Sequence, residues 1–434
     1  MTQGAPAIRE TQKIRVQLQV RGVVQGVGFR PYVYNLARRH GVAGFVLNSP
    51  RGVFIEVEGP LAIVDAFIAA LPAEAPPLVQ IARIQRSEIP TLGLTGFSIH
   101  ESGGGESAFA LVPPDICVCD ACLADTRDPA NRRYDYPFTN CTNCGPRYSI
   151  ILDVPYDRPR TTMAEFEMCP DCRREYEDPE NRRFHAQPNA CPVCGPRLLL
   201  AAESSSVPQL ASTRAILEHV ADRLRAGGIV AWKGLGGYQL ACDARQAAAV
   251  DELRRRKRRS EKPFAIMVAN ADIACTLCFV SEPEREALVR SERPIVLLRR
   301  RPDADLADGV SPGNPTIGVM LPCTPMHDLL FRILRERWQA DAVLVMTSGN
   351  ISEEPIVIEN AEAEEHLAGI ADIFAHHDRR IHTRVDDSVV RVVAGHTMLL
   401  RRARGYTPRP IWLGRGEGEI LACGAQLKNT LCLT

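Results

Sequence analysis

The sequence lacks an excess of charge of either sign, a long apolar run and an apolar leader. Lysine plus arginine and aspartate plus glutamate each number 52 among 434 residues, so a global basic field for holding nucleic acid is absent, although a neutral total still permits local patches. No segment reaches the roughly 18 apolar residues of a membrane span. The opening MTQGAPAIRETQKIR does not have the apolar core of a signal peptide. We therefore expect a soluble cytoplasmic protein of roughly three domains, without membrane contact.

Cysteine, in contrast, is abundant, with 15 in the chain. Cytoplasmic cysteines stay reduced, so metal binding is the leading explanation for them. Four C-x-x-C pairs (CDAC, CTNC, CPDC and CPVC) are separated by 18, 24 and 18 residues. The surrounding text repeats with a period of 50, as DPANRRYDYPFTNCTNCGPR and then DPENRRFHAQPNACPVCGPR, which indicates an internal duplication.

Eight thiolates can form two closed, tetrahedral and therefore structural Cys₄ zinc sites. The predicted ligands are Cys119, Cys122, Cys141, Cys144, Cys169, Cys172, Cys191 and Cys194. Disulfides are the weaker alternative, and the spacing leaves open whether each zinc is bound within one repeat or across both. Cys117 lies outside the pattern, and the isolated CTLC pair at Cys275 and Cys278 is expected to serve packing.

The first hundred residues predict alternating strands and helices in the order β-α-β-β-α-β, the split ferredoxin-like arrangement. Residues Ile14, Val16, Leu18 and Val20 alternate with polar residues, which indicates a strand with one buried face. The remaining predicted elements are a helix over FRPYVYNLARRH, a strand at Ala43–Leu47, a strand over VFIEVEG, a helix at Leu61–Leu71 and a strand at Val79–Gln85.

The glycine-rich loop GVVQGVGFR, Gly22–Arg30, falls between the first strand and the first helix. Unpaired N–H groups at a helix N-terminus favour an anion, and Arg30 can hold a phosphate bidentately. A tight turn with a surface arginine is the simpler reading. The loop also resembles the acylphosphatase signature G-x-V-Q-G-V-x-F-R at every fixed position. That resemblance implies that Arg30 clamps the phosphate of an acyl phosphate and that Asn48, in GFVLNS, orients the attacking water.

The third part of the chain begins after ESSSVPQLAST with a helical run, a buried strand at IVAW and the segment KGLGGYQL. Taken alone, the basic run Arg254–Lys262 favours a solvated helix face over a targeting patch. The segments together resemble the YrdC/Sua5 fold, whose members join a carbamate-type acid to AMP using ATP. The resemblance implies that ATP is a substrate beside Mg²⁺, with nucleotide contacts at Lys257, Arg259, Ser348, Asn350 and, less securely aligned, Ser388 and Arg402.

One departure from that fold concerns substrate size. The threonylcarbamoyl-adenylate synthases carry a P-T-E/D-T-x-Y-G-L segment where this chain has KGLGGYQL, Lys233–Leu240. The altered pocket wall favours a smaller carbamate substrate. A synthase of that kind, acting in tRNA modification, is still kept as an alternative, as is a zinc-ribbon protein that binds nucleic acid, although neutral charge makes nucleic acid unlikely.

The whole chain is thus predicted to be an α+β multidomain protein. It combines a ferredoxin-like acylphosphatase domain at 12–102, a double Cys₄ zinc module at 114–198, a YrdC/Sua5-like α/β nucleotide-binding domain at 205–413 and the start of a Kae1-like domain at 418–434. This order resembles the HypF family of hydrogenase maturation carbamoyltransferases.

The family resemblance implies that carbamoyl phosphate is hydrolysed to carbamate, which ATP converts to carbamoyl-adenylate. The carbamoyl group then passes to the C-terminal cysteine of a HypE-type partner for synthesis of the cyanide ligand of nickel–iron hydrogenase. The sequence contains no H-x-x-x-H metal cluster, and His376, His377 and His382 are expected to be structural or surface residues. We therefore expect hydrolysis and activation without final transfer.

Overall fold

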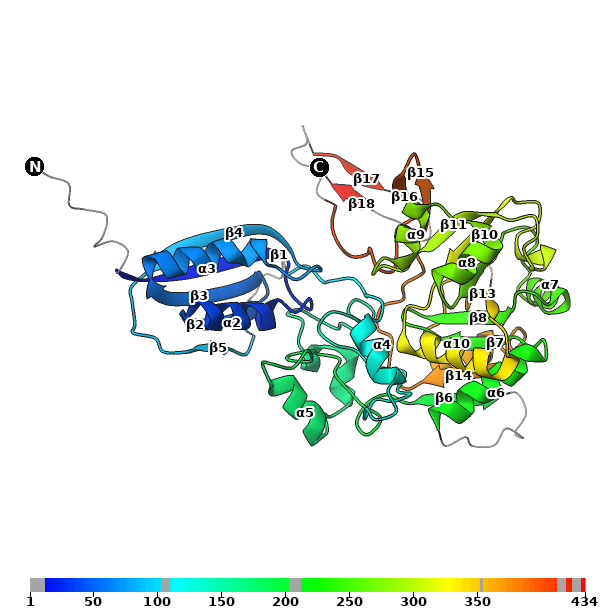
Figure 1. Cartoon of the computed structure of the whole chain (residues 1–434), viewed down its shortest axis with the longest axis horizontal. Helices are drawn as coiled ribbons and strands as arrows, with labels where there is room; N and C mark the ends of the chain where they lie inside the picture. Colours follow the sequence, from blue (N-terminus) through cyan, green and yellow to red (C-terminus); the bar gives the residue numbers. More distant parts are fainter. Residues whose placement is uncertain are drawn as a thin grey trace, which may run out of the picture. The chain divides into compact units, whose positions relative to one another are not determined.

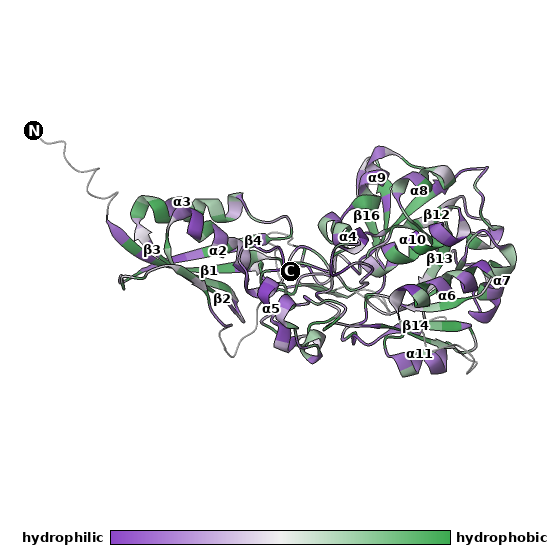
Figure 2. Ribbon diagram, turned by 60° about the horizontal axis from the view of Figure 1, so that its bottom comes forward, coloured by the Kyte–Doolittle hydropathy of each residue, from purple (hydrophilic) through white to green (hydrophobic). Residues whose placement is uncertain are grey.

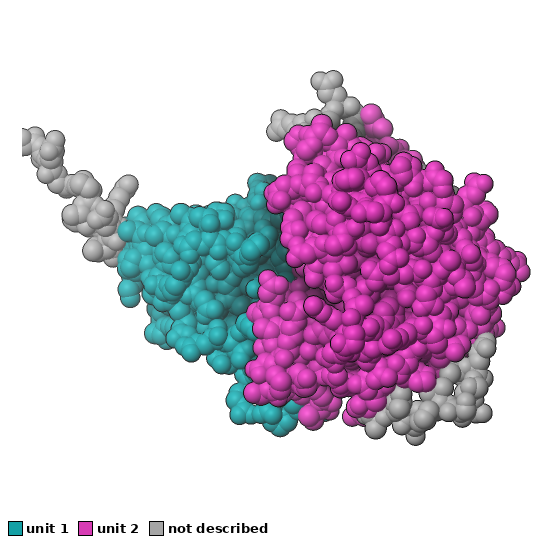
Figure 3. Space-filling model, turned by 45° about the vertical axis from the view of Figure 1, so that its right-hand side comes forward, with its two compact units in different colours: residues 1–113, 140–143, 151–189 teal, residues 114–139, 144–150, 190–434 magenta. Residues whose placement is uncertain are grey.

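The computed structural model describes residues 12–102, 110–202, 212–351, 354–411, 419–423 and 431–433. The chain forms two compact units, drawn in different colours in Figure 3. The first unit comprises residues 1–113, 140–143 and 151–189, and the second comprises 114–139, 144–150 and 190–434. The cysteine-rich repeats contribute residues to both units. Among the described helices, none combines the length and the apolar character that crossing a membrane requires.

The first unit contains a five-stranded sheet with the strand order β4-β1-β3-β2-β5. Its strands are β1 (Lys13–Val23), β2 (Ala43–Ser49), β3 (Gly52–Pro60), β4 (Gln80–Ile89) and β5 (Phe97–Ile99). The strands β1, β2, β3 and β4 pair antiparallel, which agrees with the predicted ferredoxin-like order. Strand β5 adds parallel to β2 and was not predicted, because three residues are too few to show an alternating pattern.

Two helices, α2 (Phe29–His40) and α3 (Leu61–Ala73), pack on this sheet (Figure 1). Alternate side chains of β1 enter one apolar cluster together with Val33 and Leu36 of α2 and Phe67 of α3. Gly41 follows α2 in the left-handed conformation, with φ of 68°, as expected for a glycine just past a helix end. The sheet and helices therefore hold the loop before α2 on a rigid base.

The second unit is built on an eleven-stranded mixed sheet with the order β16-β15-β11-β12-β9-β13-β8-β7-β14-β6, and β10 pairs with β11. The strands are β6 (Leu198–Ala202), β7 (Val230–Lys233), β8 (Tyr238–Asp243), β9 (Ala265–Val268), β10 (Cys278–Phe279), β11 (Ile295–Arg300), β12 (Thr316–Met320), β13 (Val343–Ser348), β14 (Ile373–His377), β15 (Val389–Val393) and β16 (His396–Arg401).

Helices cover both faces of this sheet, and each face has its own apolar cluster. Buried side chains of α6 (Thr213–Arg225) and α10 (Pro325–Trp338) belong to one cluster. The other cluster includes residues of α7 (Ala247–Arg256), α8 (Ala271–Leu277), α9 (Glu282–Val289) and α11 (Asn360–His366). In Figure 2 hydrophobic and hydrophilic stretches alternate along α6, as expected for a helix with one buried side.

The cysteine-rich repeats contain little regular structure beyond the short helices α4 (Asp120–Arg127) and α5 (Pro170–Glu177) and two 3₁₀ turns (Arg158–Arg160 and Thr162–Glu165). Equivalent arginines of the two repeats make reciprocal contacts. Arg133 donates from Nε to the carbonyl oxygen of Ala190 at 2.9 Å, and Arg183 donates from Nε to that of Asn140 at 3.2 Å. Each accepting residue directly precedes the first cysteine of a pair in the other repeat.

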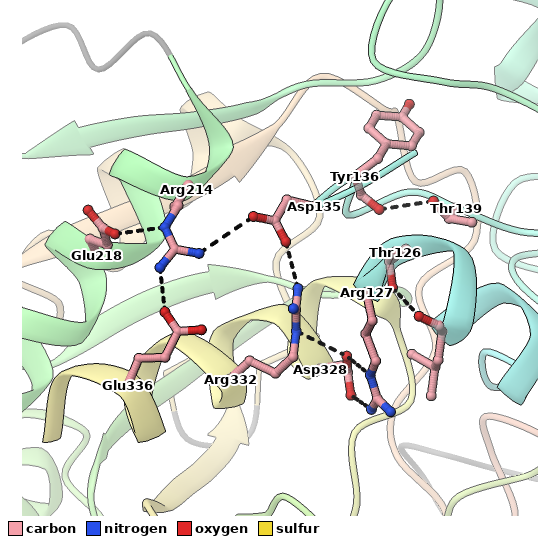
Figure 4. A network of polar contacts seen from close by, with 11 residues as sticks. Thr126, Arg127, Asp135, Tyr136, Thr139, Arg214, Glu218, Asp328, Arg332 and Glu336 are labelled. Atoms are coloured by element: carbon pink, nitrogen blue, oxygen red, sulfur yellow. Dashed lines mark hydrogen bonds and ion pairs between the residues drawn. The ribbon is translucent and has the colours of Figure 1, made fainter. Parts of the chain in front are cut away.

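A network of ion pairs joins the first repeat to α6 and α10 within the second unit (Figure 4). The carboxylate of Asp135 lies 2.6 Å from a guanidinium nitrogen of Arg332 on α10 and 3.6 Å from one of Arg214 on α6. Asp328, on α10, pairs with Arg127 of α4. Arg127 and Asp135 of the first repeat are therefore held against α6 and α10 by ion pairs.

The last described residues form a small antiparallel pair, β17 (Leu421–Cys423) and β18 (Leu431–Leu433). Both strands fall in the segment 418–434, for which the start of a Kae1-like domain is predicted. Residues 418, 424–430 and 434 of that segment lie outside the described residues.

Candidate functional site

The segment Gly22–Arg30 runs from the end of β1 through the connecting loop into the first turn of α2, which agrees with the predicted strand–loop–helix order. Its side-chain anchor is Gln25, whose Nε2 donates to the carbonyl oxygens of Ser49 and Gly52, both at 2.8 Å. The Oε1 of Gln25 accepts from the backbone N–H of Tyr156 at 3.0 Å. The loop is therefore tied both to the sheet of its own domain and to a segment from the cysteine-rich part of the chain.

Gly26 and Gly28 of this loop have φ values of 65° and 75°, a conformation that favours glycine. Space also requires glycine at the first position. A Cβ atom at Gly26 would lie 2.9 Å from the ring of Pro113 and 3.0 Å from the ring of Tyr156. The glycine loop is thus closely covered by Pro113 and Tyr156, which lie outside the ferredoxin-like fold.

Arg30 and Asn48 meet beside the loop, which brings the two predicted acylphosphatase residues together. Only 8% of Arg30 and 1% of Asn48 are exposed. With its amide oxygen toward Arg30, Asn48 accepts from Nε at 3.2 Å and from a terminal nitrogen at 3.1 Å. The opposite orientation offers only a 3.5 Å contact from Nδ2 to the carbonyl oxygen of Tyr156, so we favour the first. The simpler reading of Arg30 as a surface arginine is wrong.

Asp157 is a residue of this site that the sequence reasoning missed. Its Oδ1 lies 2.6 Å from a terminal nitrogen of Arg30, and its Oδ2 accepts from the hydroxyl of Ser102. Asp157 lies between the two cysteine repeats, 127 positions after Arg30. No spacing or motif links two residues so far apart, so only the fold could show their contact.

Tyr176 and His185 complete the surroundings of Arg30 on the side of the cysteine-rich segment. Burial lowers the pKa of His185 to about 3, and the positive charge of Arg30 acts in the same direction. Burial also raises the pKa of Tyr176, whose hydroxyl lies 3.1 Å from Oε1 of Gln187. At neutral pH the site therefore presents a neutral imidazole and a neutral phenol beside a charged guanidinium.

The eight predicted metal ligands form two groups of four. Cys119, Cys122, Cys141 and Cys144 make one group, and Cys169, Cys172, Cys191 and Cys194 make the other. Within each group all the sulfur atoms lie within 4.8 Å of one another. A tetrahedral Zn–S₄ site has sulfur–sulfur edges of about 3.8 Å, so both groups fit zinc.

The grouping answers the question of pairing that the sequence left open, since each site takes its ligands from one repeat. Among the described residues, none of these eight cysteines forms a disulfide, and neither do Cys117 and Cys278, both buried, or the partly buried Cys275. The two four-cysteine groups support structural zinc. They are the only such groups found in the part of the chain that the structure describes.

Lys257, Ser348 and Asn350, predicted to contact a nucleotide, lie together at the end of β13. Lys257 is 1% exposed, and its ammonium group donates to the carbonyl oxygen of Ser348 at 2.7 Å and to Oδ1 of Asn350 at 2.9 Å. The hydroxyl of Ser348 donates to the same Oδ1 at 2.7 Å. The expectation that the basic run is a solvated helix face is therefore wrong for Lys257, because the chain turns inward after α7 ends at Arg256.

A cavity of about 330 Å³ opens beside this cluster. Its lining includes Arg259, Phe264, Ser348, Asp387 and Arg401. The pKa of Arg259 is lowered to about 10, first by burial and then by the positive charges of Arg254 and Arg401. Arg259 therefore stays charged at neutral pH, and the cavity has cationic groups suited to a polyphosphate.

Ser388 and Arg402, the less securely aligned residues, are engaged with the backbone next to this cavity. The buried hydroxyl of Ser388 donates to the carbonyl oxygen of Arg404 at 2.9 Å. Arg402 donates to the carbonyl oxygens of Tyr406 and Arg409. Their sequence neighbours Asp387 and Arg401 line the cavity instead. The nucleotide roles of Ser388 and Arg402 stay predictions.

His376 and His377 of the third part belong to internal polar contacts, whereas His382 is exposed. His376 lies between the hydroxyl of Tyr238, 2.6 Å from Nδ1, and a carboxylate oxygen of Glu364, 2.8 Å from Nε2. His377 is fully buried, and its Nε2 lies 3.3 Å from the carbonyl oxygen of Gly234. Neither residue belongs to a metal-ligand group among the residues that the structure describes.

Comparison with protein families divides the chain in the same way as its motifs. Residues 16–99 match the acylphosphatase family, residues 118–151 and 168–201 match the HypF finger, and residues 222–403 match the Sua5/YciO/YrdC family, described under telomere recombination. The predicted combination of an acylphosphatase-like domain, a duplicated finger and a YrdC-like domain is confirmed.

Several relatives that match nearly the whole chain are carbamoyltransferases named HypF. The chain is 51% identical to carbamoyltransferase HypF2 of Cupriavidus necator, covering 98% of the chain and 54% of that protein. It is 46% identical to carbamoyltransferase HypF of Synechocystis, covering 96% and 54%. The crystal structure of a full-length HypF in the phosphate- and nucleotide-bound form superposes with a TM-score of 0.90 at 45% identity, covering 98% of this chain and 54% of that one. The chain spans about half the length of these relatives.

Proposed function

Because the chain belongs to the HypF family of carbamoyltransferases over nearly its full length, we propose that it performs the first two steps of a carbamoyl relay. In the first step, water cleaves carbamoyl phosphate to carbamate and inorganic phosphate. In the second, a carbamate oxygen attacks the α-phosphate of ATP, which forms carbamoyl-adenylate and releases pyrophosphate. The observation that carries the proposal is the contact of Arg30 with Asn48 beside the glycine loop.

The first step needs positioning more than a nucleophilic side chain, because an acyl phosphate is already activated. The N–H groups of the loop and the N-terminus of α2 favour a phosphate, and Arg30 supplies a fixed positive charge. Asn48, in contact with Arg30, would orient the attacking water. Burial of both side chains reduces competition from bulk water and strengthens these electrostatic interactions.

The second step uses the cavity beside Lys257 and Ser348. Arg259 and Arg401 line the cavity and would neutralise the charge that builds up on the triphosphate as carbamate attacks. Lys257 would add its buried positive charge from beside Ser348, to whose carbonyl oxygen it donates. Mg²⁺ entering with ATP would supply positive charge for the phosphate groups, and such an ion is usually held through one or two carboxylates. Asp386 and Asp387 line the cavity and are the candidates to hold it.

We propose that the activated carbamoyl group is then transferred to the C-terminal cysteine of a HypE-type acceptor for the cyanide ligand of nickel–iron hydrogenase. The chain spans about half the length of its relatives. A threonylcarbamoyl-adenylate synthase is not favoured, because relatives over the whole length are carbamoyltransferases. Nucleic-acid binding is not favoured either, because the formal net charge is zero.

Mass spectrometry of the products from carbamoyl phosphate and Mg·ATP tests the proposal. We expect carbamoyl-adenylate and pyrophosphate with carbamoyl phosphate, and neither product when bicarbonate and threonine replace it. Formation of threonylcarbamoyl-adenylate would instead establish the alternative enzyme. Absence of both adenylates, with ATP unchanged, would refute the second step.

A further inference from the structure

The carboxylate of Asp157 contacts Arg30, the predicted phosphate ligand, although Asp157 lies outside the acylphosphatase-like fold. Its two oxygens are held by different partners, Oδ1 by Arg30 at 2.6 Å and Oδ2 by the hydroxyl of Ser102. The preceding residue, Tyr156, packs over Gly26 and bonds to Gln25 through its backbone N–H. The segment that covers the glycine loop therefore holds the carboxylate of Asp157 against the guanidinium of Arg30.

A carboxylate next to a phosphate site needs a reason, because two anions in one small site repel each other. A guanidinium has five N–H donors. Arg30 directs Nε and one terminal nitrogen at Asn48 and Asp157, and its other terminal nitrogen can hold a phosphate. The part of a bound substrate that faces Asp157 must then be its uncharged end. For an acyl phosphate, that end is the acyl group.

Acyl phosphates share the phosphate and differ in the acyl group. The carbamoyl group ends in an NH₂ with two hydrogen-bond donors, whereas an acetyl group ends in a methyl with none. An ionised carboxylate only accepts hydrogen bonds and has about four lone-pair sites, so Asp157 can accept from an NH₂ in addition to Arg30 and Ser102, whereas a methyl group offers it no donor. A site with an acceptor placed for a substrate N–H discriminates against an analogue that lacks the donor.

From this arrangement we propose that Asp157 is the specificity residue of the first site and accepts hydrogen bonds from the amide of carbamoyl phosphate. The proposal rests on the proposed hydrolysis and assigns to it the source of substrate choice. Ser102 then acts as a positioning residue, because its hydroxyl holds the second oxygen of the carboxylate. The segment between the cysteine repeats thereby contributes the acceptor for the substrate amide, which the ferredoxin-like fold does not supply.

A different role for Asp157 would be that of a counter-ion that occupies Arg30 only until phosphate replaces it. Such a counter-ion would compete with every acyl phosphate to the same extent. Its removal would change the rates for acetyl and carbamoyl phosphate by one common factor. The ratio of the two kcat/KM values therefore separates recognition of the amide from simple competition.

The test measures phosphate release from carbamoyl phosphate and from acetyl phosphate by the full chain and by Asp157→Ala and Asp157→Asn. We expect the ratio of kcat/KM, carbamoyl over acetyl, to fall at least about tenfold in Asp157→Ala, with the value for acetyl phosphate changed less than about threefold. Asp157→Asn should give an intermediate ratio, because its amide oxygen can still accept one N–H. Asp153→Ala is the matched control: Asp153 belongs to the same segment, is 71% exposed and pairs with Arg160 rather than Arg30.

An unchanged ratio in Asp157→Ala, whatever the absolute rates, would overturn the proposal. So would an equal gain or loss for both substrates. Zinc content shows whether the Ala variant folds. If it does not, the near-isosteric Asn variant decides: a kcat/KM ratio equal to that of the unmodified chain would likewise overturn the proposal. Failure of the unmodified chain to hydrolyse either substrate would instead refute the proposed function, so the two failures are distinguishable.

Discussion

The ammonium group of Lys257 donates a 2.9 Å hydrogen bond to the side-chain oxygen of Asn350, although 93 positions separate them. The same nitrogen also reaches the carbonyl oxygen of Ser348. A buried cation held by oxygen atoms at the edge of a cavity is positioned before any ligand arrives. This preorganisation is the property that electrostatic stabilisation of a transition state requires.

Replacing Lys257 by alanine should remove adenylate formation and leave phosphate release intact. We expect the rate of pyrophosphate formation that depends on carbamoyl phosphate to fall at least about 100-fold, because one fixed positive charge is lost. Release of inorganic phosphate from carbamoyl phosphate should change little. Arg255→Ala is the control, because Arg255 is exposed on α7 and pairs with Glu252. Loss of both activities in Lys257→Ala would contradict separate sites.

Replacing Arg30 by alanine should abolish hydrolysis of carbamoyl phosphate. The expected loss in kcat is about 100- to 1000-fold, since the substitution removes the fixed cation of the phosphate site. Phosphate release measured by a coupled assay gives the result directly. Arg39→Ala, at the exposed end of α2 where Arg39 pairs with Glu74, should retain the normal rate. Hydrolysis at an undiminished rate in Arg30→Ala would show that the loop has another role.

Metal analysis should find two zinc ions per chain. Cys141→Ser should reduce the content to one and lower the unfolding midpoint by at least about 5 °C, because structural zinc contributes directly to folding. Cys117→Ser, outside both groups of four, should keep both ions. A content of one in the unmodified chain, or two in Cys141→Ser, is incompatible with two separate four-cysteine sites.

The stability of the chain should fall between pH 7 and pH 5 in part because of His185. Its folded pKa of about 3 lies below the ordinary value of 6.5, so the unfolded chain binds the proton more readily in this range. Stability conferred by the neutral ring is thus complete above about pH 7 and is lost as the pH falls toward 3. Between pH 7 and 5 the loss should be about 1–2 kcal/mol.

Comparison with His185→Gln isolates this contribution, because acid also protonates zinc-bound cysteines in both proteins. Chemical denaturation at pH 7 and pH 5 should show a smaller difference in unfolding free energy for the variant. Equal differences for the two proteins would mean that His185 already binds a proton in the folded state near pH 6.

Motifs with a fixed local spacing allowed much of the site to be predicted. Arg30 and Asn48 lie on adjacent elements of a common fold, and the structure brings them together. Lys257 and Ser348 were found through resemblance, whereas their burial could not be foreseen from a run of basic residues. The contact of Asp157 with Arg30 depends on how the chain returns from the first cysteine repeat, which no local pattern encodes.

The cysteines illustrate the same distinction. Their residue type and spacing determine the metal and the number of sites, because four thiolates suit one tetrahedral ion. Their assignment to one ion or the other could not be read from two equal gaps of 18 residues, since both arrangements satisfy the count. The position of every sulfur atom in the folded chain was needed to decide it.

The reciprocal contacts of Arg133 and Arg183 have an evolutionary consequence. In each copy of the duplicated segment, a backbone carbonyl oxygen accepts a hydrogen bond from the arginine of the other copy. The same reciprocal pattern occurs at the interface of a symmetric homodimer. Deleting one copy would therefore remove a hydrogen-bond acceptor from the buried arginine of the other. Loss of either copy is expected to destabilise the one that remains, so the duplication would have been difficult to reverse once it was fixed.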